Sequence, residues 1–137
     1  MPKVTFTKKS LIICVMADEQ TVTGFLLAGT GQRGKDGSQN FMIVNKDTND
    51  DALEQTFKTW TNKEEVGIIL IGQSYAERIR NMIVEHQENE EKLLPTILEI
   101  PTKECPYDPT KDGMLVKAAS KLYGLEAGLE KLKNLDE

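Results

Sequence analysis

Residues 12–29 read IICVMADEQTVTGFLLAG, an apolar run followed at once by a segment with helical spacing. The run is apolar nearly throughout, as in strands that are covered on both faces. Asp18 comes directly after it and can cap a helix that carries Val22 and Phe25 on one face and ends at Gly29. This stretch therefore predicts a buried strand that leads directly into a helix.

The same alternation continues along the chain. Helical segments with cap-like starts follow at Asp51, with Glu54 three residues on, and at Ser74, with Glu77 three residues on. Strands separated by helices and short connections form parallel sheets with right-handed crossovers. We therefore expect an α/β domain over residues 1–101, with a four-stranded parallel sheet flanked by helices in a Rossmann-like or receiver-like topology. The four predicted strands are Leu11–Ala17, Phe41–Val44, Val66–Ile71 and Thr96–Ile100.

The pattern changes after the fourth strand. Residues 102–111 are rich in proline and lack periodicity, which predicts a stiff extended connector. Residues 112–137 then predict a projecting C-terminal helix, weakened by Gly124 and Gly128 at about 1 kcal/mol each. Its apolar residues, spaced three and four apart, make a narrow seam typical of a coiled coil, which favours a partner over packing back on the sheet. The seam consists of Leu115, Ala118, Leu122, Leu125, Leu129 and Leu132.

The composition limits the classes of function. The formal charge is −5, from 22 acidic and 17 basic side chains, which argues against a nucleic-acid-binding protein. The only cysteines are Cys14, expected to be buried, and Cys105, so a reducing compartment is expected. The first apolar run is too short to span a membrane. We expect a soluble cytosolic protein.

Two motifs could carry chemistry, but their context disagrees. Gly29, Gly31 and Gly34 match GxGxxG, yet the motif follows a predicted helix and precedes a strand, the reverse of a dinucleotide-binding loop. It predicts a helix end followed by a flexible loop over Gln32–Gln39. His86 is the only histidine and is expected on a solvated helix surface, because one histidine cannot supply a metal cluster. We predict no catalytic residue, no cofactor and no metal.

Asp18 and Glu19 raise a second possibility, a receiver-like signalling domain. Such a domain adds an aspartate at the end of its third strand, where this chain has Gly72-Gln73-Ser74. Lys103 would complete the set only if that aspartate were present. Helix capping by Asp18 is the preferred interpretation. The receiver-like function stays open as the alternative, as does a small enzyme that binds a nucleotide at Gly29–Gly34.

Longer stretches of the chain resemble the F subunits of vacuolar-type ATPases, and the eukaryotic form most closely. The patterns DE-TVTGFLLAG-G and LEIP-K--PYDP-KD are more specific than any single motif. Gly72, where the family often has Asn, and the tail after Tyr123 depart from the family pattern. The matching stretches are IICVMADEQTVTGFLLAGTG (12–31), NFMIV (40–44), IILIGQSYAERIR (68–80) and PTILEIPTKECPYDPTKDGML (95–115).

The resemblance implies a non-catalytic subunit of the rotating central stalk. It implies binding to the coiled-coil D subunit of the V-type ATPase, with ATP hydrolysed elsewhere, between the large A and B subunits. The complex would lie on the cytosolic face of vacuolar or endosomal membranes and couple hydrolysis to proton transport. The residues expected to contact partners are Leu115, Ala118, Leu122 and Leu125 on the terminal helix, and Gln73, Glu77 and Arg80 after the third strand.

Overall fold

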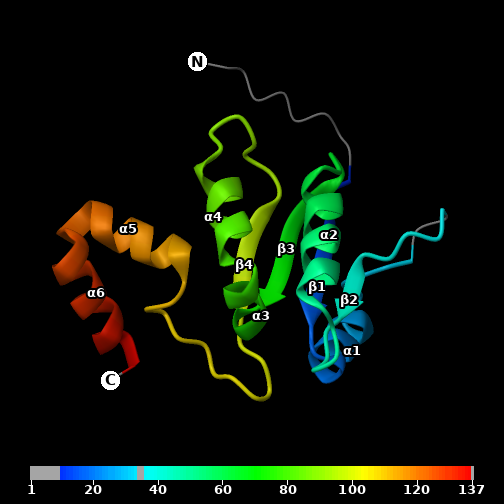
Figure 1. Cartoon of the computed structure of the whole chain (residues 1–137), viewed down its shortest axis with the longest axis horizontal. Coiled ribbons are helices and arrows are strands. Elements are labelled where there is room, and N and C mark those ends of the chain that lie inside the picture. The colour runs from blue at the N-terminus through cyan, green and yellow to red at the C-terminus, as the bar shows by residue number, and fades with distance from the viewer. Residues whose placement is uncertain (1–9, 34–35, 137) are drawn as a thin grey trace.

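The four predicted strands form one parallel sheet in the computed structural model, which describes residues 10–33 and 36–136 (Figure 1). The strand order is β2-β1-β3-β4. The predicted α/β class is thus confirmed. The helices and strands are β1 (Ile12–Ala17), α1 (Glu19–Leu27), β2 (Phe41–Ile43), α2 (Asp50–Thr61), β3 (Val66–Gly72), α3 (Gln73–Arg78), α4 (Arg80–Glu88), β4 (Thr96–Ile100), α5 (Gly113–Tyr123), α6 (Leu125–Lys133) and a short 3-10 turn (Asn134–Asp136).

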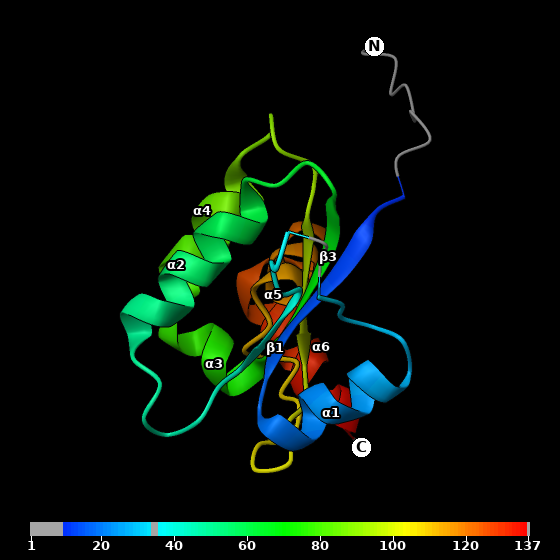
Figure 2. The same ribbon diagram turned by 90° about the vertical axis from the view of Figure 1, so that its right-hand side faces the viewer.

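The sheet is covered unequally on its two faces. Successive side chains of a strand point to opposite faces, so Cys14 and Met16 lie in the larger core beneath α2 and α4, and Val15 lies beneath α1. Figure 2 shows α2, α3 and α4 on one side of the strands and α1 on the other. The helices α5 and α6 lie beyond the β4 edge (Figure 1). Of the helices in the described residues, none combines the length and apolar character needed to cross a membrane.

The first helix begins and ends as the sequence predicts. The Asp18 carboxylate accepts hydrogen bonds from the backbone N–H of Thr21 at 3.1 Å and from its hydroxyl at 2.7 Å. After the helix, the N–H groups of Gly29 and Thr30 donate to the carbonyls of Leu26 and Phe25, which is a Schellman ending. Gly29 has a φ of +89°, which favours glycine.

The next two helices do not begin at the predicted caps. Asn49, not Asp51, precedes α2, and Asp50 in its first turn pairs with Arg78. Gly72, not Ser74, precedes α3, and the side chain of its first residue, Gln73, bonds to the connector described below. The expected single helix after β3 is also interrupted at Ile79, where the chain leaves helical geometry and buries the side chain.

His86 is not on a solvated surface, so that expectation is wrong. Its Nε2–H donates to the carbonyl oxygen of Pro95 at 2.8 Å, and its ring packs edge-on against Phe57 with 6.2 Å between the ring centres. The imidazole is half-buried and ties the end of α4 to the start of β4.

Candidate functional site

The tail is a helical hairpin rather than the predicted single helix. Gly124 separates α5 from α6 with a φ of +84° and a ψ of 163°, a conformation that only glycine adopts readily. Helices α5 and α6 pack mainly on each other. At their crossing a Cβ on Gly128 would lie 2.8 Å from the backbone carbon of Ala119, so glycine permits the close approach.

Of the predicted seam, the hairpin buries only Leu132. Ala119, Gly128 and Leu132 are buried between the helices. Leu122 keeps 76% of its surface exposed and Leu125 keeps 61%. The large apolar residues of the tail that are exposed are Met114, Leu115, Leu122, Tyr123, Leu125 and Leu135. Most of the predicted contact residues are therefore uncovered in the free chain.

The predicted contact residues Leu115, Ala118 and Leu122 share one side of α5 because they are three and four positions apart. All three are exposed. Leu125 lies after the break, at the first position of α6. We name Leu115, Ala118 and Leu122 the α5 strip. Exposed apolar surface of this kind marks an interaction site more often than scattered single residues do.

Gln73 holds the connector against the end of β3. Its side chain is buried, and its Nε2 donates to the backbone oxygen of Asp108 at 2.8 Å. Its Oε1 accepts from the backbone N–H of Asp108 at 2.6 Å. The same Nε2 also donates to Glu99 at 3.2 Å. The end of β3 is thereby joined to a residue 35 positions later.

Arg80 and Glu99 form an ion pair beside Gln73. The Glu99 side chain is only 3% exposed, and it also receives the Gln73 amide. The hydrogen bonds that the Arg80 guanidinium donates to this carboxylate raise the pKa of Arg80. Glu77 lies outward and pairs with Lys111 at 3.6 Å, where both side chains are about half exposed. All three predicted residues after β3 thus contact β4 or the connector.

The connector is fixed at its far end as well. The Tyr107 hydroxyl donates to Asp112 at 2.5 Å, and burial together with this bond raises the pKa of Tyr107. Asp112 in turn caps α5 by accepting from the N–H of Met114 at 2.9 Å. We name Gln73, Arg80, Glu99 and the Tyr107–Asp112 segment the connector clamp. It sets the direction in which α5 leaves the sheet.

Sequence reasoning missed Glu99, Tyr107, Asp108 and Asp112 as members of this site. The PYDP-KD pattern was the available signal, because two prolines around Tyr107 and Asp108 restrict the backbone. Gly72 belongs to the same arrangement. A Cβ at Gly72 would lie 2.6 Å from Thr102 Cγ2, so the absence of a side chain there lets the connector pass close to β3.

A cleft of about 720 Å³ lies at the carboxyl ends of the strands, where ligands bind in many open α/β sheets. Both acidic and basic side chains line it, and some of them already bond within the chain. Asp18 caps α1, and Arg78 pairs with Asp50. Gln73 stands where a receiver domain has its third carboxylate, and it bonds to Asp108. Within residues 10–33 and 36–136, no three histidine, cysteine or acidic side chains are placed to hold a metal ion.

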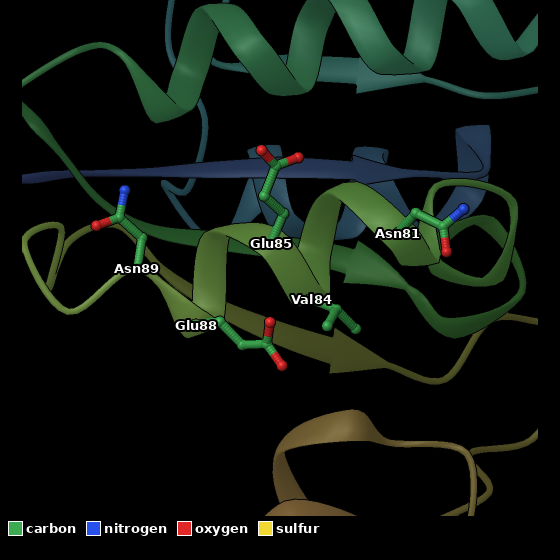
Figure 3. Close-up of a pocket in the computed structure, with 5 residues that line it drawn as sticks. All are labelled: Asn81, Val84, Glu85, Glu88 and Asn89. Carbon is green, nitrogen blue, oxygen red and sulfur yellow. The ribbon is translucent and has the colours of Figure 1, made fainter.

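The GxGxxG segment and a hollow on α4 are no better suited to a ligand. Gly29 and Gly31 follow a helix end, as predicted, while Gly34 and its neighbour at 35 lie outside the described residues. Arg33 and Gln39 form an isolated antiparallel bridge in the predicted loop. Figure 3 shows that the side chains around the α4 hollow diverge instead of converging on one point. They are Asn81, Val84, Glu85, Glu88 and Asn89.

The family model and the similar proteins found by comparison indicate the same family. The family described as ATP synthase (F/14-kDa) subunit matches residues 13–117, so its match ends within α5. The chain is 46% identical over 107 residues to the F subunit of the human V-type proton ATPase, covering 78% of this chain and 87% of that protein. It is 42% identical over 109 residues to the corresponding protein of Dictyostelium discoideum, covering 80% and 88%.

Among solved structures, the F subunit of the V-type ATP synthase from Archaeoglobus fulgidus is similar to this chain. The TM-score is 0.46 at 23% identity, covering 66% of this chain and 98% of that one.

Proposed function

The chain belongs to the F-subunit family of V-type proton ATPases, and from this premise we propose that it is a non-catalytic subunit of the rotating central stalk. In this role it binds the coiled-coil D subunit. It stiffens the rotor and helps to transmit torque from ATP hydrolysis to the proton-carrying ring. The complex that contains it lies on the cytosolic face of vacuolar or endosomal membranes.

The observation that carries the proposal is the exposed apolar surface of the tail. Leu122 and Leu125 could each contribute about 1.5–3 kcal/mol if a partner buried them completely, before the costs of association. A coiled coil offers an apolar seam of matching width to the α5 strip. The tail is thus suited to lie against another helix.

The connector clamp supports the same role. A subunit that transmits torque must resist rotation between its parts. The clamp joins β3 to β4 and the connector through part-buried hydrogen bonds of Gln73 and the Arg80–Glu99 ion pair, and it reaches α5 through the cap at Asp112. A network of hydrogen bonds away from full solvent exposure stiffens the surrounding structure. The helices α5 and α6 are therefore presented in a defined direction rather than on a flexible linker.

The test is a pull-down with the recombinant D subunit of a V-type ATPase. Leu122→Glu combined with Leu125→Glu should abolish capture, because two charges would have to be buried. Leu27→Glu on α1 is the matched control, since Leu27 is 85% exposed and lies on a different helix. Circular dichroism should show an intact fold in both variants. Undiminished capture of the double variant by the D subunit would refute the proposal for the tail.

A further inference from the structure

A groove of about 480 Å³ runs between α5 and the segment that joins α4 to β4. Apolar side chains from both walls line it, and lysines stand along it. The apolar lining is Leu93, Pro95, Ile97, Met114 and Ala118, and the basic lining is Lys92, Lys117 and Lys121. Glu90 is the one acidic side chain in the lining. The groove is therefore an apolar channel with a basic border.

The α5 wall of the groove is built from one face of the helix. Met114, Lys117, Ala118 and Lys121 are at positions i, i+3, i+4 and i+7, so they lie side by side along α5. This face adjoins the α5 strip, because Ala118 belongs to both. A helix packed on the strip would therefore have its flank beside the two lysines.

The two α5 lysines carry charge that the described part of the chain leaves without an ionic partner. Neither Lys117 nor Lys121 pairs with a carboxylate among residues 10–33 and 36–135. They are also the only charged residues of α5. Lys92 differs, because its Nζ donates to Asn62 at 3.1 Å. A local basic border on a chain with a net charge of −5 is a feature that a partner can recognise.

We propose that this groove binds a protein helix whose apolar stripe is flanked on one side by carboxylates, with Lys117 and Lys121 selecting that helix and setting its orientation. In coiled coils, charges beside the apolar seam fix the choice and direction of the partner in this way. The inference rests on the proposed function, in which the D subunit supplies the helix. It adds the chemistry by which that helix is recognised.

Other occupants fit the charges less well. The chain's own N-terminal residues, MPKVTFTKK, carry three lysines and no carboxylate, so the basic border would repel them. Nucleic acid requires many phosphate contacts, and two or three lysines around an apolar floor supply few. A second copy could offer Val84 with Glu85 and Glu88 from the surface of α4, and the experiment below includes that outcome.

The first arm measures binding of the recombinant D subunit to the full chain by titration calorimetry. Lys117→Glu with Lys121→Glu should weaken binding by about tenfold or more at low salt, because two attractions become repulsions. High salt should reduce the difference, since exposed charges are screened. Lys46→Glu with Lys58→Glu changes the net charge equally away from the groove and should bind like the unmodified chain. Equal affinity for all three proteins would overturn the inference, while binding itself would leave the proposed function standing.

The second arm does not depend on the D subunit. Two synthetic coiled-coil peptides share one apolar heptad and carry either glutamate or lysine beside it. The unmodified chain should prefer the glutamate peptide, and the Lys117→Glu, Lys121→Glu variant should prefer the lysine peptide. If the D subunit fails to bind but this reversal is seen, the groove inference stands and the proposed partner is wrong. Absence of the reversal, or salt-sensitive dimers of the chain alone in sedimentation, would refute the inference.

Discussion

The carboxamide of Gln73 bonds to both the N–H and the carbonyl of Asp108, as the backbone of a neighbouring strand would. The two hydrogen bonds, of 2.8 and 2.6 Å, attach a segment without regular structure to the end of β3. The side chain of Gln73 therefore makes the two backbone hydrogen bonds that a further strand would make at the end of β3. Removing its donor should weaken the whole connector clamp.

Gln73→Glu should lower the free energy of unfolding by about 2–4 kcal/mol at neutral pH. The new carboxylate cannot donate to the Asp108 carbonyl, and it would lie beside the buried Glu99. Urea denaturation measures the change. Gln55→Glu, on the exposed surface of α2, is the matched control and should alter stability by less than about 0.5 kcal/mol. Similar losses in both variants would mean that the clamp does not contribute to stability.

Gly128→Ala and Gly24→Ala should have opposite effects, although both glycines lie inside helices. A Cβ at Gly24 meets nothing within 4 Å, so alanine should stabilise α1 by about 0.5–1 kcal/mol. A Cβ at Gly128 meets the backbone of Ala119 and should force α6 away from α5. Hydrogen exchange of the α5 and α6 amides reports the separation. If Gly128→Ala slows exchange there, helix propensity outweighs the close packing.

The cap at Asp18 should make stability depend on pH in acid. Burial would raise the pKa of Asp18, but the hydrogen bonds from Thr21 outweigh it and lower the pKa below 3.8. The folded state therefore favours the ionised carboxylate. The stabilisation that the cap contributes is complete above the pKa of Asp18 in the unfolded chain, and it is lost as the pH falls through the pKa of Asp18 in the folded chain. Asp18→Asn keeps a capping oxygen and removes the charge. Urea denaturation from about pH 2 to above the unfolded pKa measures the free energy of unfolding at each pH. This free energy should change less steeply with pH in the variant than in the unmodified chain, and an equal dependence on pH would contradict the assignment.

The two cysteines should react at very different rates. Cys14 is fully buried, and burial raises the pKa of its thiol to about 12, so little thiolate forms. Cys105 is partly exposed in the connector. Ellman's reagent should titrate one thiol in the native chain and both in urea. Cys105→Ser should leave no rapidly reacting thiol, and a fast native reaction in that variant would show that the core around β1 opens readily.

The sheet could be predicted because the sequence features that indicate its strands and the first helix lie within a few residues of one another. Each strand is a short apolar run, and Asp18 and Gly29 mark the ends of α1 by contacts within a few residues. The clamp could not be predicted in this way, because Gln73 and Asp108 are 35 positions apart. His86 was misjudged for the same reason. Its glutamate-rich neighbourhood indicated solvent, while its partners Phe57 and Pro95 come from other parts of the chain.

The tail was predicted in part. The helical spacing from Asp112 onward was sufficient to indicate helix and an exposed apolar surface. Propensity alone assigned Gly124 a small penalty within one continuous helix. The structure instead uses its positive φ to reverse the chain, and Gly128 then provides the space for the second helix. Only the three-dimensional pairing of α5 with α6 distinguishes these outcomes.

The turn at Gly124 shortens the distance over which the tail can extend. At 1.5 Å per residue, α5 spans roughly 16 Å, whereas an unbroken helix over residues 113–133 would span roughly 31 Å. Leu122 and Leu132 therefore do not lie along one straight helix that a partner helix could follow, and Leu132 is buried. A partner therefore meets a short, wide footprint of about three turns, and mutations that affect its affinity should cluster within that length.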